Sequence, residues 1–303
     1  MERPTPQVAT IAGLVSIALW ASAFVGIRAV AADLSPGSIA LGRLVIGAAL
    51  LGVLVARQGW VRPSRATFVL LVAIGLFWSA ESIVLATGER LVDAGTAAML
   101  VGIGPIFITL LSGWLLREGW PARLLIGCLV AFGGTAIIGI ATAAETGGPS
   151  TNVVGVGLCV VVAFLYAAGV TLQKPALRSL SAVQVTWGAC VVAAIACLPF
   201  APGLLEELGR ARSESVAWLV YLGIVPTSIG FSLWAFALAR MTAGRAGTLG
   251  YLESPMAILI SWVVLAETPA TLAIVGGALC IVGVIVARST GRVGEPSGGP
   301  IAA

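Results

Sequence analysis

Three charged side chains lie inside apolar segments that are long enough to cross a lipid bilayer. They are Arg43, Glu81 and Glu253. A charge near the bilayer centre costs at least about 2.5 to 3.5 kcal/mol on insertion scales, so each should face a wet cavity or a partner. A guanidinium can hold a carboxylate through two parallel hydrogen bonds, and a carboxylate can bind an ammonium group or a proton. These residue types therefore indicate a binding site for a small charged molecule.

Each charge also has a structural interpretation that the sequence leaves open. Glu253 can pair with Arg43, or lie near the cytoplasmic mouth and be solvated. Arg43 can instead join two helices, by donating hydrogen bonds to backbone carbonyls of a neighbouring helix. Glu81 can be a buried, protonated carboxylate with no contact to a substrate.

Aromatic side chains fall within the same apolar segments rather than only at their ends. An aromatic wall offers flat apolar contact and attracts an ammonium group by about 0.5 to 2 kcal/mol. Packing and interfacial anchoring are the alternatives for each of these side chains. The predicted substrate contacts are Trp20, Arg43, Trp78, Glu81, Tyr166, Trp234, Tyr251 and Glu253.

Two prolines inside apolar segments predict breaks in the helices that carry these groups. Proline removes a backbone donor, and a preceding glycine loosens the turn. The pairs Gly104-Pro105 and Ser254-Pro255 are therefore predicted hinges. For most of the 38 glycines, close packing between helices is the simpler explanation.

The elements that must position these residues are membrane-spanning helices. The chain has 303 residues, 59% hydrophobic and 10% charged, with a mean hydropathy of +1.06. About 20 apolar residues cross a bilayer, and ten such runs can be counted. They lie near 8–31, 35–56, 67–87, 94–116, 124–144, 152–173, 181–202, 216–239, 246–266 and 268–287. We expect an all-α integral membrane protein.

The distribution of cations predicts the orientation. With the N-terminus in the cytoplasm, most of the 17 Lys and Arg residues fall in cytoplasmic loops, and only Arg28, Arg90, Arg210 and Arg212 fall on the other side. The positive-inside rule thus favours a multi-pass protein of the inner membrane with both termini cytoplasmic. The cations form no patch, so no nucleic-acid partner is expected.

The chain repeats itself. The segment from Ala94-Gly95 through Pro105 to Glu118 matches Ala243-Gly244 through Pro255 to Glu267 at an offset of 149, with a one-residue slip at the prolines. An odd number of spans per repeat turns the second half upside down relative to the first. We therefore expect two inverted five-helix repeats, 1–148 and 149–290, followed by a disordered cytoplasmic tail, 291–303.

These features resemble the drug/metabolite transporter superfamily in its ten-span, EamA-like branch. The resemblance rests on Leu19-Trp20-Ala21-Ser22-Ala23-Phe24, on Arg43, and on the two segments that run from proline to glutamate. Its layout is most similar to the amino-acid exporters of the YddG kind. The resemblance implies export of small metabolites, amino acids foremost and apolar or aromatic ones among them. The two near-equivalent inverted halves favour alternating access, because they can exchange conformations and open a central site to one side and then to the other.

Other classes of function are kept as alternatives or set aside. Export of other amphiphilic metabolites or drugs, such as nucleosides or sugars, and a non-transporting sensor or scaffold stay open. An enzyme is not expected, because the chain has no His and both aspartates, Asp33 and Asp93, fall in loops. The five cysteines lack metal-binding spacing, so neither a metal nor a cofactor is predicted. The expected partners are a small-molecule substrate and the lipid bilayer; coupling to protons, and a monomer or a homodimer, stay open.

Overall fold

The computed structural model describes residues 6–88, 91, 100–145, 152–265 and 271–289, and these residues form helices and turns without a β-strand among them. The helices of the first half are α1 (Pro6–Val30), α2 (Pro36–Gln58), α3 (Arg65–Gly88), α5 (Gly104–Leu115) and α6 (Ala122–Glu145). Those of the second half are α7 (Val153–Ala176), α8 (Ala182–Ala196), α9 (Ala201–Leu208), α10 (Ser213–Leu222), α11 (Phe231–Leu238), α12 (Ala243–Leu249), α13 (Glu253–Leu265) and α14 (Thr271–Arg288).

Local sequence signals explain where several helices begin. The side chain of Asn152 accepts a hydrogen bond from the backbone N–H of Gly155 at 3.0 Å, at the start of α7. Ser181 does the same for α8, and Thr242 for α12. Helix α2 begins with Pro36, whose missing N–H would have had no helical partner in the first turn.

Within the described residues, six helical segments are long and apolar enough to cross a membrane. They are Pro36–Gln58, Arg65–Leu85, Ala122–Ala141, Val153–Ala176, Ser213–Leu238 and Thr271–Arg288. The pair Ala182–Ala196 and Leu198–Leu208, bent by 53°, makes a seventh if it is one span. The chain is thus an all-helical membrane protein in its described part. Of the other three predicted spans, the first lies on α1, of which only Gln7–Ala23 enters this comparison, the fourth lies partly outside the described residues, and the ninth is interrupted between α12 and α13. The count of ten therefore stays a prediction.

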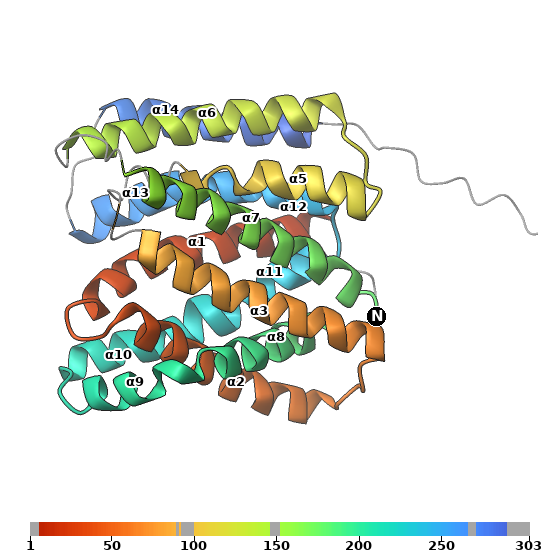
Figure 1. Ribbon diagram of the computed structural model, residues 1–303. Coiled ribbons are helices and arrows are strands. Elements are labelled where there is room, and N and C mark those ends of the chain that lie inside the picture. The colour runs from red at the N-terminus through yellow and green to blue at the C-terminus, as the bar shows by residue number, and fades with distance from the viewer. Residues whose placement is uncertain (1–5, 89–90, 92–99, 146–151, 266–270, 290–303) are drawn as a thin grey trace, which may run out of the picture.

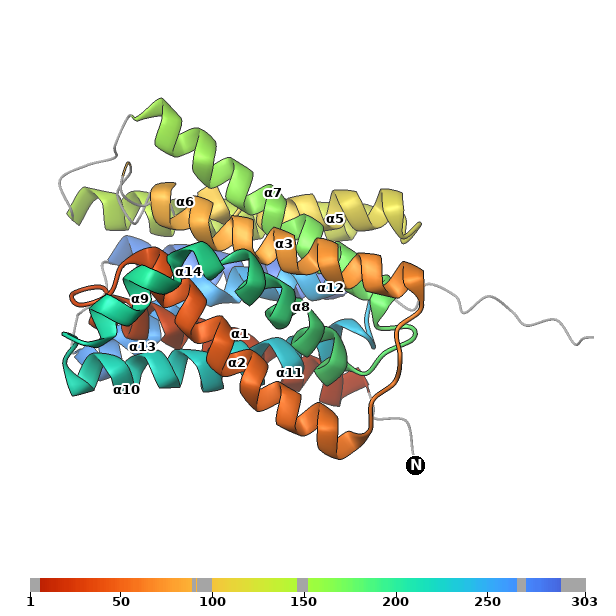
Figure 2. The ribbon, with the colours of Figure 1, turned by 60° about the horizontal axis from the view of Figure 1, so that its bottom comes forward.

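The helices run side by side in a bundle (Figure 1). Helices α6 and α14 pack along their length at one edge, and α2 packs on α8 at the other. Between these edges, α1 contacts α11 and α13, whereas α7 contacts α3 and α5. Turning the bundle leaves α3 crossing α7 and α2 beside α8, in agreement with these contacts (Figure 2).

The two ends of the bundle differ in the residues that they carry. One end holds the starts of α1 and α12 and the ends of α2, α5, α7 and α11; we call it the N-terminal end (Figure 1). The opposite end holds the α1–α2 turn and the starts of α7 and α10. Most described loop cations lie at the N-terminal end, whereas Arg210 and Arg212 lie at the opposite end.

Glycines allow the close contact between α6 and α14. A Cβ added at Gly134 would lie 2.5 Å from the carbonyl oxygen of Gly276, and one at Gly283 would approach the backbone of Gly127 at 2.6 Å. Small residues let helix backbones approach in a membrane, where no hydrophobic force drives helices together. For these four repeated glycines, the packing interpretation of the sequence is confirmed.

Both predicted breaks are present. A turn at Gly102-Ile103 precedes α5, which begins at Gly104-Pro105. A 3-10 turn, η3 (Gly250–Leu252), separates α12 from α13, and Pro255 then lies in the first turn of α13, where its missing N–H breaks no helical bond. Whether the chain hinges at these breaks stays a prediction.

A third break, which the sequence did not predict, lies between α10 and α11. The segment η2 (Gly223–Gly230) is a π-helix with Pro226 inside it. The hydroxyl of Thr227 donates to the carbonyl of Leu222 at 2.8 Å, and two side chains of α1, Ser16 and Trp20, donate to the carbonyls of Gly230 and Pro226. The polar backbone groups of the irregular segment are thus bonded by side chains.

Candidate functional site

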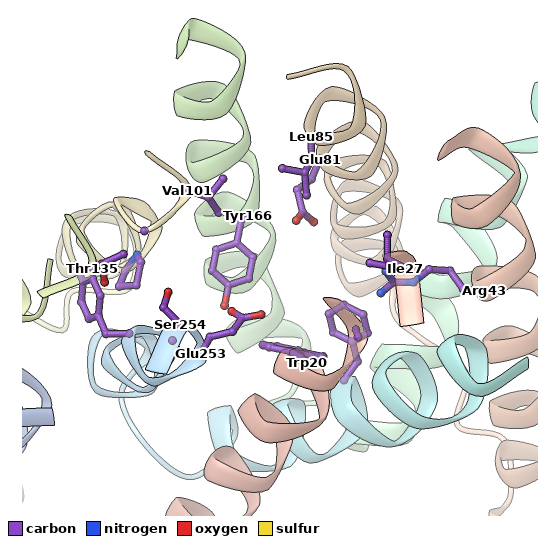
Figure 3. Close-up of a pocket in the computed structure, with 16 residues that line it drawn as sticks. Trp20, Ile27, Arg43, Glu81, Leu85, Val101, Thr135, Tyr166, Glu253 and Ser254 are labelled. Atoms are coloured by element: carbon purple, nitrogen blue, oxygen red, sulfur yellow. The ribbon is translucent and has the colours of Figure 1, made fainter. Parts of the chain in front are cut away.

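A cavity of about 240 Å³ lies between the helices of the two halves (Figure 3). At about 30 Å³ per water, it has room for a solute of amino-acid size. Its lining comprises Trp20, Ala23, Ile27, Arg43, Glu81, Leu85, Val101, Gly102, Pro105, Thr135, Tyr166, Phe231, Gly250, Tyr251, Glu253 and Ser254. The cavity thus combines apolar walls with three charged groups.

Trp20 is held rigidly at one wall. Its indole N–H donates to the carbonyl of Pro226 at 3.1 Å, and its ring lies 5.0 Å from the ring of Phe231 and 5.2 Å from that of Trp234. The π-helix supplies the carbonyl that fixes the ring. Trp20 and Phe231 therefore form one aromatic surface that faces the cavity.

Arg43 reaches the cavity from α2, and its orientation is set by the π-helix. Its Nε donates to the hydroxyl oxygen of Thr227 at 3.0 Å. The two terminal nitrogens of the guanidinium have no hydrogen-bond partner among the described residues. A guanidinium held at one nitrogen leaves its other donors for the carboxylate of a bound molecule.

Two carboxylates line other parts of the cavity. Glu81 points into it from α3, and Glu253 lies next to the hydroxyl of Tyr166 (Figure 3). In the described part of the chain, neither carboxylate makes an ion pair, and the pairing of Glu253 with Arg43 that the sequence allowed is absent. The three charges are therefore separate groups around one space rather than a closed salt bridge.

The structure brings six of the eight predicted substrate contacts together. The lining includes Trp20, Arg43, Glu81, Tyr166, Tyr251 and Glu253. Two predicted residues lie behind it: Trp78 is buried and stacks on Phe231 at 4.3 Å, and Trp234 is fully buried. Of the predicted hinges, Pro105 and Ser254 line the cavity, Gly104 packs against Tyr166, and Pro255 packs near Gly277 on α14.

Several site residues were missing from the predicted set. Thr227 was missed because its role depends on a π-helix, which leaves no periodic pattern in the sequence. Ile27 and Phe231 are apolar side chains in apolar helices, and only the packing shows that they face a cavity. Residues 81 and 85 share a helical face, which could have identified Leu85 from Glu81.

The site presents one guanidinium, two carboxylates and aromatic rings to the cavity. Nowhere in the described residues do three or more potential metal ligands come together. All five cysteines are free and buried. The groups that face the cavity are suited to hold opposite charges and an apolar body in one molecule.

The sequence matches one protein-family model twice. The model describes the EamA-like transporter family and matches residues 7–140 and 153–289. The chain belongs to the EamA-like transporter family. The resemblance to the drug/metabolite transporter superfamily is thus confirmed, and this EamA-like chain is a transporter by family.

Curated relatives of this EamA-like chain carry transporter names. It is 31% identical, over 94% of its length and 95% of the relative's, to a probable terminal-alkyne amino-acid exporter of Streptantibioticus cattleyicolor. It is 29% identical to the uncharacterized transporter YdfC of Bacillus subtilis, over 94% and 92% of the two lengths. A probable amino-acid metabolite efflux pump of Salmonella typhimurium is 25% identical over 66% of this chain and 71% of that one.

A solved structure shares the fold. Its chain superposes with a TM-score of 0.77 at 22% identity, and the match covers 92% of this chain and 96% of the other. At that identity the likeness speaks for the fold alone.

Proposed function

We propose that this EamA-like transporter is a secondary carrier that exports amino acids, including apolar and aromatic ones, by alternating access. One observation carries the proposal: Arg43 and two carboxylates face the same aromatic-walled cavity without pairing with one another. A zwitterion satisfies that arrangement, with its carboxylate on Arg43 and its ammonium group near Glu81 or Glu253. The apolar side chain then lies against Trp20 and Phe231.

The names of two relatives support the substrate class. Both the probable terminal-alkyne amino-acid exporter and the probable amino-acid metabolite efflux pump are named for amino acids or their metabolites. Export rather than import rests on these names and on the family resemblance. Other amphiphilic metabolites are the second candidate, favoured by the large apolar share of the cavity lining.

We also propose ten spans in two inverted halves, 1–148 and 149–290, in the inner membrane with both termini in the cytoplasm. Two matches to the same family model and the reciprocal contacts of α1 and α7 support the repeat. The cations gathered at the N-terminal end support the orientation.

Uptake by proteoliposomes tests the substrate class. Vesicles with the purified full chain would be offered a labelled panel of amino acids, nucleosides and sugars, with protein-free vesicles as the control. Saturable uptake of amino acids is the expected result. Saturable uptake of nucleosides or sugars instead would favour the second candidate, and no uptake across the panel would contradict transport of these classes.

A further inference from the structure

Buried polar atoms without a hydrogen-bond partner lie between the cavity and the N-terminal end. They are both amide atoms of Gln173 and the indole nitrogen of Trp234. Gln173 is 1% exposed and Trp234 is fully buried. Burying a polar group without a partner is costly, so a role in another conformation is a physical reason to keep it.

The described residues that line the cavity lie mostly on the side of these atoms that faces the opposite end. On α1 it is lined by Trp20, Ala23 and Ile27, in the half of that helix farther from the N-terminal end. On α7 only Tyr166 lines it, and Gln173 lies about 10 Å farther along that helix, at 1.5 Å per residue. Trp234 and Leu249 are buried in the layer between the cavity and the N-terminal end.

The repeat relates this closed layer to the open half of the cavity. Aligning Gly13 with Gly157 puts Ala23 opposite Ala167 and Ile27 opposite Thr171. The first member of each pair lines the cavity, whereas the second member is buried. If the two halves exchange conformations, the stretch of α7 that leads to Gln173 takes the place now held by the end of α1.

Two charged groups hold the closed end together. The carboxylate of Glu118, just after α5, accepts hydrogen bonds from the backbone N–H groups of Ala243 at 2.9 Å and Gly244 at 3.2 Å. The ammonium of Lys174 on α7 donates to the carbonyls of Leu238, at 2.6 Å, and Met241. The α11–α12 turn is therefore fixed from both sides by α7 and by the segment after α5.

We propose that Gln173 and Trp234 line the second half of the substrate path, which is closed in this structure and held closed by Glu118 and Lys174. This inference rests on the proposed alternating access. It assigns to two unpaired polar groups, the amide of Gln173 and the indole N–H of Trp234, the task of solvating a polar substrate after the N-terminal end has opened.

Thiol labelling tests the proposal without any substrate. The five native cysteines would be replaced by Ala, Gln173→Cys introduced into the full chain, and its reaction with a charged, membrane-impermeant maleimide timed in vesicles. Adding Glu118→Ala should raise the labelling rate about tenfold or more, and only from the membrane face of the N-terminal end. The matched control is Val185→Cys. Val185 lies near the same end of the bundle and is fully buried. It belongs to the apolar cluster between α2 and α8, away from the proposed path.

Equal labelling rates at positions 173 and 185 after release of Glu118 would overturn the proposal. A second variant covers the case in which the cysteine-free protein fails to fold. Gln173→Leu, with native cysteines, should melt at the same or a higher temperature yet transport about tenfold more slowly, whereas unchanged transport would also overturn it. Because labelling needs no substrate, a wrong substrate class would not be mistaken for a wrong path.

Discussion

The Nε of Arg43 donates to the hydroxyl of Thr227 at 3.0 Å, and that hydroxyl donates in turn to the carbonyl of Leu222 at 2.8 Å. The chain of bonds links a charged group of the cavity to a π-helix in the other half of the protein. π-Helical turns are frequent at functional sites because they re-aim side chains and free backbone carbonyls. The irregular segment thus sets the direction of the guanidinium.

Removing the Thr227 hydroxyl should weaken binding without removing the charge. In Thr227→Val, Arg43 loses the acceptor that orients it, and a hydrogen bond to a charged group is worth about 1.5 to 3 kcal/mol. We expect KM for amino acids to rise by about tenfold or more. Thr227→Ser, which keeps the hydroxyl, is the control in the same uptake assay. Equal KM values for the Val and Ser variants would contradict a positioning role.

The carboxylates of Glu81 and Glu253 should recognise the ammonium group of the substrate. Glu81→Gln and Glu253→Gln keep the size of each side chain but remove its charge. We expect at least one of these variants to raise KM for amino acids about tenfold. In the same variant, inhibition by the carboxylic acid analogue that lacks the amino group should weaken by a smaller factor. Competition curves measured with both compounds check this difference. A parallel loss for both compounds in both variants would show that neither carboxylate recognises the ammonium group.

Trp20 and Trp78 should respond differently to substitution. Trp20 faces the cavity, whereas Trp78 is 4% exposed and stacks on Phe231 behind it. We expect Trp20→Leu to weaken transport of aromatic amino acids more than that of alanine, because a stacked aromatic pair adds about 0.5 to 1.5 kcal/mol beyond its buried area. Trp78→Leu should instead lower the melting temperature and affect all substrates alike. Kinetics for phenylalanine and alanine, with melting curves, separate the two effects.

The α6–α14 contact should tolerate no added methyl group. In Gly134→Ala, the new Cβ would meet the carbonyl oxygen of Gly276 at 2.5 Å and the backbone nitrogen of Cys280 at 2.7 Å. Overpacking of this kind costs about 1 to 3 kcal/mol. The control is Gly157→Ala, where nothing lies within 4 Å of the added atom. Melting curves of both variants in the same detergent should show a lower melting temperature for Gly134→Ala alone.

The carboxylate of Asp33 should make the stability of the protein depend on pH. The pKa of Asp33, in the α1–α2 turn, lies below its ordinary value because the Ser215 hydroxyl and Arg212 donate hydrogen bonds to it. A lowered folded-state pKa stabilises the protein above the unfolded value near 3.8. This contribution is lost as pH falls through the folded pKa. The melting-temperature difference between wild type and Asp33→Asn should therefore be full at pH 6 and shrink below about pH 4; a constant difference would contradict the linkage.

The sequence predicted much of the helical framework and most of the charged site. Long apolar runs fix where helices lie, and Gly250 with Pro255 marked a break that is present. Arg43, Glu81 and Glu253 could be predicted because a charge inside an apolar run needs a polar environment. The bend between α8 and α9 and the π-helix were not predicted, because both depend on packing between distant helices. For Trp78 and Trp234, residue type and helix position do not distinguish a cavity wall from the layer behind it.

Uptake of phenylalanine tests the central claim, that one cavity holds the two opposite charges of an amino acid. Proteoliposomes would take up labelled phenylalanine in competition with phenethylamine, which lacks the carboxylate, and with phenylpropionate, which lacks the ammonium group. We predict saturable phenylalanine uptake, at least tenfold weaker inhibition by either analogue, and loss of this preference over phenethylamine in Arg43→Gln. Equal inhibition by both analogues and by unlabelled phenylalanine, with no effect of Arg43→Gln, would contradict the account.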